Sequence, residues 1–311
     1  MAIIKKSKPA LYLKGYARIL APCKYDYSTV VAQLSSKLST EQLEYVQQRV
    51  DYYCKSSFTP NPSSVLVKDL KKPISPKAYY FDTFEYAQYF DENLPLNVDF
   101  GDVTYVPEFP SIVKSRPLFE DNKNSVLLNL DKVRHFVWVD DDQAFENKKS
   151  LMIGRGAVYQ MHRYLFYERY FNHPLCNLAQ VNKKGGNQDW YKPKISLKKH
   201  LEYKFILSLR GNDVATNLKW IMSSNSVAVT TKPIMESWFM EGKLEGGKHF
   251  IEIKDDYSDL EEQLNFYLAH PEKCLEIIKN ANEYCEQFWN PNIEKLCSLL
   301  VLEKYFRLDP H

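Results

Sequence analysis

The stretch YKFILSLRGNDVATNLKWIMSSNSVAVTTKPIMESWFMEGKLEGG, residues 203–247, decides the fold. Its first apolar run, residues 204–209, is too short for a buried helix and is predicted to be a strand. Apolar residues then recur at helical spacing over 213–222, with Asp213 as the expected N-cap. The β-branched run 226–231 is expected to be the next strand. The stretch therefore predicts a βαβ unit, whose crossover is right-handed.

Arg210 directly follows the first predicted strand and precedes the predicted helix. Ligands of open α/β sheets bind at the carboxyl ends of the strands, where free backbone N–H groups and the helix dipole favour anions. A guanidinium group pairs with phosphate oxygens through its planar fork of donors. This predicts a diphosphate site, to which Ser208 and Asn217 would add hydrogen bonds. The alternative is a surface arginine paired with Asp213.

Two other positions fit the same kind of site. A short predicted strand at 151–153 ends in Gly154-Arg155-Gly156, and glycines let a backbone approach a ligand closely while the arginine reaches it. Glu236 is expected to begin a helix over 234–240, where a carboxylate is favourable. The structural alternatives are a turn arginine and a carboxylate that only stabilises its helix.

Length and composition exclude several classes of protein. The chain has 311 residues, which suits two domains, and its net charge of +2 gives no sign of nucleic-acid binding. No apolar run approaches the roughly 20 residues of a membrane helix, and residues 1–20 do not have the pattern of a signal peptide. The six cysteines are scattered, which predicts a reducing compartment and neither a disulfide scaffold nor a zinc site.

Several segments together resemble the glycosyltransferase family 90 domain. They are SIVKSRPLFEDNKNSVLLNLDKVRHF at 111–136, IGRGAVYQMHRYLFYERYFNHPLCNLAQV at 153–181, RGNDVATNLKWIMSSNSVAV at 210–229, ESW at 236–238 and HFIEIKDDYSDL at 249–260. The family includes bacterial lipopolysaccharide core-modifying enzymes, fungal capsule-associated proteins and animal protein O-glucosyltransferases. The segments occur in the family's order and are most similar to its bacterial branch.

The resemblance implies an α/β protein of GT-B-like architecture, with two Rossmann-like domains facing across a cleft. Residues 1–148 would form the acceptor-side domain and 149–311 the nucleotide-sugar-binding domain. The implied reaction moves a sugar from a UDP-sugar to a hydroxyl of a lipopolysaccharide or lipooligosaccharide core, or of a related saccharide. It would invert the anomeric centre and need neither metal nor a cofactor besides the donor. Arg155 would lie in the donor pocket, and Glu236 would accept the ribose hydroxyls.

The implied partners are the nucleotide-sugar donor and a glycolipid or oligosaccharide acceptor, with no nucleic acid. A cytoplasmic protein in peripheral contact with the inner membrane is the expected location. The sequence departs from the family at the catalytic base. The animal enzymes carry an aspartate after the arginine that matches Arg116, whereas this chain has Pro117. Asp102, Glu120, Asp121 and His135 are substitutes on chemical grounds only. Asp102 is our predicted base, because a Gly-Asp turn can present a carboxylate; the alternative is that Asp102 satisfies turn N–H groups.

Two other functions stay open at this point. A strand-like run at 136–139 ends in Asp140-Asp141-Asp142, the pattern with which another class of sugar transferases holds a divalent metal. Acidic runs also cap helices or face solvent. The missing aspartate at Pro117 raises the second alternative, a non-catalytic saccharide-binding protein of the same fold.

Overall fold

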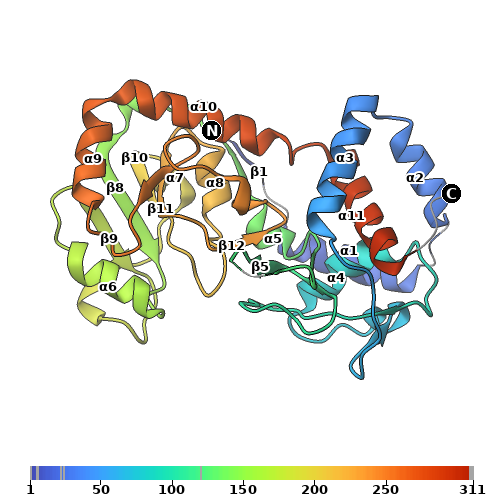
Figure 1. Ribbon diagram of the computed structural model, residues 1–311. Helices are drawn as coiled ribbons and strands as arrows, with labels where there is room; N and C mark the ends of the chain where they lie inside the picture. Colours follow the sequence, from blue (N-terminus) through green and yellow to red (C-terminus); the bar gives the residue numbers. More distant parts are fainter. Residues whose placement is uncertain (1, 5–6, 22, 24, 120, 308–311) are drawn as a thin grey trace. The chain divides into compact units, whose positions relative to one another are not determined.

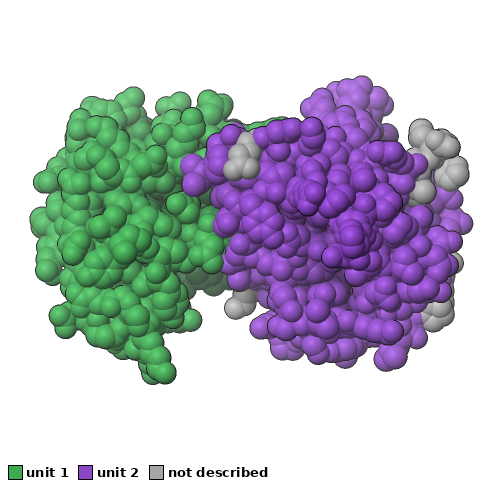
Figure 2. All heavy atoms as spheres, turned by 60° about the horizontal axis from the view of Figure 1, so that its bottom comes forward, with its two compact units in different colours: residues 1–5, 136–233, 243–286 green, residues 6–135, 234–242, 287–311 purple. Residues whose placement is uncertain are grey.

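The computed structural model describes residues 2–4, 7–21, 23, 25–119 and 121–307, and the chain forms two compact units (Figures 1 and 2). Unit 1 comprises Met1–Lys5, Phe136–Pro233 and Lys243–Glu286; unit 2 comprises Lys6–His135, Ile234–Gly242 and Gln287–His311. Both are built from non-contiguous segments, whereas the sequence predicts one cut between residues 148 and 149. The roles of acceptor and donor domain stay predictions.

Unit 1 contains a five-stranded parallel sheet in the order β13-β11-β10-β8-β9. The strands are β8 (Lys149–Gly156), β9 (Cys176–Gln180), β10 (Tyr203–Leu207), β11 (Val227–Thr231) and β13 (Ile251–Ile253). The parallel pair β10–β11 confirms the predicted βαβ strands, and β8 confirms the strand predicted at 151–153. The α/β class is therefore confirmed.

The order of the strands reverses at one place in this sheet. From β8 the chain runs to β9 at the edge, and then returns to β10 on the other side of β8. In open α/β sheets, ligands bind outside the carboxyl ends of the strands at such a reversal. The topology thus points to the ends of β8 and β10.

Helices cover the sheet of unit 1 (Figure 1). They are α6 (Met161–Tyr170), α7 (Leu197–His200), α8 (Leu218–Met222), α9 (Leu260–Ala269) and α10 (Pro271–Glu286). Strand residues alternate between faces, so Phe205 and Leu207 join a core with α6, α9 and α10, while Ile206 points the other way. A short ladder of β1 (Ala2–Ile4) with β7 (Trp138–Asp140), and the 3-10 turns Phe145–Asn147 and Gln188–Trp190, complete the unit.

The helix predicted over 213–222 is wrong in its first half, because α8 begins only at Leu218. Asp213 is buried in the preceding loop and does not cap α8. The Asn217 amide instead donates to the carbonyl of Leu207 at the end of β10. Side chains of Asn and Asp compete with helix formation by such bonds, so this long-range contact replaces the first helical turns.

Unit 2 is mainly helical. It contains α1 (Lys8–Leu20), α2 (Tyr27–Ser35), α3 (Thr40–Tyr53), α4 (Lys77–Ala87), α5 (Lys132–His135) and α11 (Pro291–Phe306), with a 3-10 turn at Val67–Lys71. In the described part of this unit the strands form two-stranded ladders. These are β2 (Val65–Leu66) with β3 (Pro95–Leu96), β4 (Ser111–Val113) with β6 (Ser125–Leu127), and β5 (Ser115–Pro117) with β12 (Met235–Ser237).

The helix predicted over 234–240 is also wrong. Residues 235–237 form β12, which pairs antiparallel with β5 and places Glu236 opposite Arg116. All three residues of β12 are buried, so the strand is held by packing and by a buried charge pair that sequence spacing does not reveal. A 3-10 turn follows at Glu241–Lys243. None of the helices in the described ranges is long and apolar enough to cross a membrane.

Candidate active site

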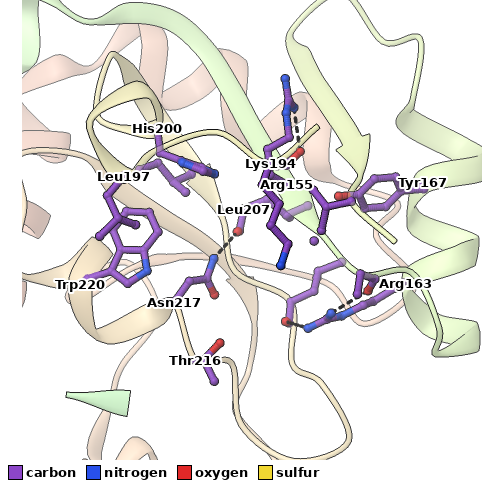
Figure 3. Close-up of a pocket in the computed structure, with 16 residues that line it drawn as sticks. Arg155, Arg163, Tyr167, Lys194, Leu197, His200, Leu207, Thr216, Asn217 and Trp220 are labelled. Atoms are coloured by element: carbon purple, nitrogen blue, oxygen red, sulfur yellow. Dashed lines mark hydrogen bonds between the residues drawn. The ribbon is translucent and has the colours of Figure 1, made fainter. Parts of the chain in front are cut away.

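A pocket of about 420 Å³ lies within unit 1 at the carboxyl ends of β8 and β10, where the strand order reverses (Figure 3). Its walls come from the end of β8, from α6, from the segment before α7 and from the loop that leads into α8. It is lined by Gly154, Arg155, Gly156, Ala157, Arg163, Tyr167, Val181, Lys194, Leu197, His200, Ile206, Leu207, Leu209, Thr216, Asn217 and Trp220.

The lining of this pocket is positively charged. Arg155, Arg163 and Lys194 contribute to it, and no aspartate or glutamate is among its lining residues. Cations on the wall of a concave site attract an anionic ligand, and partly excluded water strengthens that attraction. The pocket is therefore suited to a phosphate or diphosphate.

Arg163 holds the pocket's wall together. From α6 its guanidinium donates to the carbonyls of Ala157, Leu209 and Arg210 at 2.8, 2.7 and 2.8 Å. These bonds join the segment after β8 to the segment after β10 (Figure 3 shows two of them). The role of Arg163 could not be predicted from the sequence, because no spacing signal connects a helix residue with distant backbone carbonyls.

Arg210 lies immediately beyond this wall and is not among the residues that line the pocket, so its predicted contact with a diphosphate stays a prediction. Its carbonyl also accepts a hydrogen bond from His162 Nε2 at 3.0 Å. Burial lowers the pKa of Arg163, and the positive charge of Arg210 lowers it further. No hydrogen bond or ion pair of the Arg210 guanidinium appears among the described contacts.

Arg155 lines the pocket but points its guanidinium away from the centre (Figure 3). Its nitrogens donate to the carbonyls of Gly154 and Asn177, at 2.9 and 2.6 Å, and to the Asn177 side chain at 2.7 Å. The predicted convergence of Arg155 and Arg210 on one diphosphate stays a prediction. In this state Arg155 adds positive charge to the pocket wall while it is bound to β9.

Ser208 and Asn217 act as a pair. Ser208 is fully buried and its hydroxyl donates to Asn217 Oδ1 at 3.1 Å. Asn217 Nδ2 donates to the Leu207 carbonyl at 2.9 Å, and an amide nitrogen carries two hydrogens. Asn217 thus keeps one N–H for a ligand in the pocket, and Ser208 fixes the orientation of that amide.

Lys194 is a candidate that sequence analysis did not identify. Its ammonium group points into the space between Asn217 and Arg163 (Figure 3). No ion pair of Lys194 is present among the described residues. The residue lies in an irregular segment before α7, where no periodic pattern distinguishes it from the surrounding lysines. Only the fold brings it to the pocket.

The opposite wall is aromatic and neutral. The rings of His200 and Trp220 meet edge to face, with centroids 5.7 Å apart. Burial lowers the pKa of His200, so the ring is neutral at neutral pH. His200 Nδ1 lies 2.9 Å from the Ser196 carbonyl. Because a carbonyl only accepts, Nδ1 carries the proton and Nε2 is left as an acceptor.

Glu236 lies in unit 2 and not in this pocket. Its side chain is only 1% exposed and pairs with Arg116 Nε at 2.7 Å. The hydroxyl of Tyr52 donates to its other carboxylate oxygen. Both oxygens are therefore occupied within unit 2, and the ribose contact implied by the family resemblance stays a prediction.

Asp102, the predicted base, also belongs to unit 2. It accepts hydrogen bonds from Lys114 and from Arg134, the latter at 3.3 Å. Partial burial raises the pKa of Asp102, but the hydrogen bond and charge of Lys114 outweigh it and lower the pKa overall. The carboxylate is therefore ionised at neutral pH, as a base must be, yet it binds a proton weakly. Its catalytic role stays a prediction.

In the acidic run at 140–142, the contacts of Asp141 explain that residue as part of the fold. Asp141 accepts from Lys148 Nζ at 2.8 Å and from the backbone N–H of Asn225 at 3.0 Å, and its side chain is buried. Within the described ranges, no three His, Cys, Asp or Glu side chains come together as metal ligands.

Comparison with known proteins identifies the family. A family model described as Glycosyl transferase family 90 matches residues 143–307, which is more than half of the chain. An O-glucosyltransferase, LpsA of Dichelobacter nodosus, is 42% identical over 306 residues, covering 97% of this chain and 96% of that protein. These matches agree with the resemblance that the sequence segments carry. The chain therefore belongs to glycosyl transferase family 90 and is a glycosyltransferase.

Proposed function

We propose that this protein transfers a sugar from a UDP-sugar to a hydroxyl of a lipopolysaccharide or lipooligosaccharide core, or of a related saccharide. The observation that carries the proposal is the cationic pocket, free of carboxylates, at the point where the strand order of unit 1 reverses. The relative named an O-glucosyltransferase supports glucose as the transferred sugar.

The pocket's residues would stabilise the leaving group. When the glycosidic bond of the donor breaks, negative charge develops on the diphosphate, and fixed cations and N–H donors lower the barrier most when they are already in position. Lys194 would contact the phosphates directly, and the second N–H of Asn217 would donate to them. Arg210, which does not line the pocket, would turn its guanidinium to the phosphates from just beyond the wall. Arg155 and Arg163 would supply charge from the wall. Together these residues would stabilise the leaving diphosphate without a metal ion.

The neutral wall favours uridine as the nucleoside. Uracil has an N–H at position 3 that can donate a hydrogen bond to His200 Nε2. Cytosine has a lone pair at that position and cannot donate. Trp220 provides an apolar face beside it. A base at the aromatic wall and phosphates at the cationic wall would fill the pocket from end to end.

The reaction would proceed in one displacement with inversion at the anomeric carbon, in a GT-B-like protein. Unit 1 would bind the donor, and unit 2 would bind the acceptor and supply the base. Asp102 is our proposed base. Its neighbours Lys114 and Arg134 hold the carboxylate ionised at neutral pH, although the same contacts weaken it as a base.

The test is a thermal-shift screen of nucleotides, followed by turnover of UDP-glucose in the presence of EDTA. We expect UDP to stabilise the protein more than CDP or GDP, turnover to survive EDTA, and Arg210→Ala to lose UDP binding. Loss of turnover in EDTA together with loss in Asp140→Ala would establish the metal-dependent alternative. Glycan binding without any response to nucleotides would establish a non-catalytic saccharide-binding protein.

A further inference from the structure

Helix α1 exposes an apolar stripe. Leu13 and Leu20 are 74% and 84% exposed, and Tyr16, which lies between them, is 40% exposed. The spacings of three, four and seven residues place these side chains along one line of the helix. Exposed single leucines are ordinary on protein surfaces, but an aligned apolar set marks a surface that contacts something else.

The opposite side of α1 is firmly packed, so the stripe is presented by a rigid element. Gly15 lies so close to Phe81 of α4 that a Cβ built on it would be 2.4 Å from the ring. Tyr16 lies at the edge of the stripe nearest to α4, where its hydroxyl accepts from Lys77, the first residue of α4, at 2.9 Å. Arg18 forms an ion pair with Glu85 of α4 at 3.0 Å. The helix cannot rotate to bury the stripe without losing these contacts.

The chain segment that carries the stripe has ionisable side chains of one sign, although Glu85 of α4 pairs with Arg18. The first 25 residues contain no aspartate or glutamate, although the whole chain carries 39 of them. Their cations are Lys5, Lys6, Lys8, Lys14, Arg18 and Lys24. This segment therefore carries a charge of +6 in a chain whose net charge is only +2. Within α1, Lys8 and Lys14 are exposed and have no acidic partner among the described residues.

We infer that the outer face of α1 binds the surface of an anionic lipid bilayer. Leu13, Tyr16 and Leu20 would enter the boundary between headgroups and acyl chains, as amphipathic interfacial helices do. Lys8 and Lys14 would contact lipid phosphates, and a tyrosine suits this boundary because it has an apolar ring and a polar tip. This inference goes beyond the proposed function and rests on it only in that a glycolipid acceptor lies in a membrane.

The experiment is cosedimentation of the full chain with vesicles. One set contains phosphatidylglycerol and phosphatidylethanolamine, and the other contains phosphatidylcholine alone. We expect wild type to bind the anionic vesicles and Leu13→Gln/Leu20→Gln to lose at least about tenfold in affinity, since both side chains are solvent-exposed and the fold does not need them. Lys14→Glu should weaken binding and reduce its sensitivity to salt.

The matched control is Leu275→Gln/Lys279→Glu on α10, which also replaces an exposed leucine and an exposed lysine. It should bind vesicles like wild type. The inference would be overturned if the Leu13→Gln/Leu20→Gln variant bound anionic vesicles as tightly as wild type. It would also be overturned if wild type did not bind anionic vesicles. If wild type instead self-associates and the leucine variant does not, the face is a contact between copies of the chain. UDP binding by calorimetry is unaffected in every case, so the inference and the proposed function fail separately.

Discussion

The substitution Glu236→Gln separates two roles for one carboxylate. In the structure Glu236 pairs with Arg116 across the β5–β12 ladder, and both side chains are almost completely buried. The family resemblance instead implies that Glu236 accepts the ribose hydroxyls of the donor. The structural account predicts that Gln at this position harms the stability of unit 2 first, because glutamine is uncharged and leaves the guanidinium without its counter-ion.

The size of the effect follows from burial. Removing one partner of a buried ion pair costs roughly 3–5 kcal/mol, because the remaining charge is left uncompensated. Arg116 also donates to the carbonyls of Tyr52, Tyr53 and Ser125, so it cannot turn towards solvent without losing these bonds. With a urea m-value of about 2 kcal/mol/M, the midpoint of unfolding should fall by about 1.5–2.5 M.

The assay combines urea unfolding with hydrogen exchange, which assigns the loss to one unit. Peptides of unit 2, such as 111–119 and 234–242, should lose protection, whereas those of the five-stranded sheet should not. The double variant Arg116→Met/Glu236→Gln should recover part of the stability, because it removes the unpaired charge, while the three carbonyls stay unsatisfied. An unchanged urea midpoint together with a tenfold weaker UDP affinity would refute this reasoning and favour the ribose contact.

Three other predictions follow from the same geometry. Arg163→Lys removes the fork that holds the carbonyls of Leu209 and Arg210, so the Kd for UDP should rise about tenfold or more by calorimetry; an unchanged Kd would contradict this. Asp102→Asn should lower the rate of sugar transfer by about 10²–10⁴ and leave UDP affinity intact, and a rate within about threefold of wild type would remove Asp102 as the base. Burial lowers the pKa of three histidines of unit 1, which are His162, His200 and His249. Below the ordinary histidine pKa of about 6.5, the unfolded chain therefore binds protons that the folded unit does not bind. Stability should therefore fall as the pH drops through that value, and thermal unfolding at about pH 7.5 and 5.5 checks the sign, since an equal or higher midpoint at the lower pH would contradict it.

Local patterns predicted the strands of unit 1 well. The run at 204–209 and the β-branched run at 226–231 are short and apolar, and each became a fully parallel, buried strand. The start of α3 was predictable for the same reason, because Ser39 and Gln42 satisfy each other's backbone N–H groups within one turn. Signals of this kind depend on residues that are neighbours in the chain.

The predictions failed where distant residues decide the local structure. The local pattern of residues 234–240 after Pro233 is compatible with a helix, but Glu236 pairs with a buried arginine 120 positions earlier and lies in a strand. The loop before α8 is held by the contact of Asn217 with β10. Lys194 and His200 line the pocket because the fold brings α7 and the segment before it to the carboxyl ends of β8 and β10. Arg155 and Asn217, which line the pocket, stand out in the sequence because each lies beside a strand end or a helix start. Arg210 follows β10 but is not among the lining residues, and its contact with a ligand stays a prediction.

The central claim is that the cationic pocket of unit 1 binds the diphosphate of the donor. Its most direct test is the calorimetric titration of UDP into wild type, Lys194→Glu and the control Lys183→Glu, which changes an exposed lysine that does not line the pocket. A charge-assisted hydrogen bond contributes about 1.5–3 kcal/mol, so Lys194→Glu should raise the Kd by about tenfold to a hundredfold while Lys183→Glu leaves it unchanged. Equal affinity in all three proteins would contradict the account.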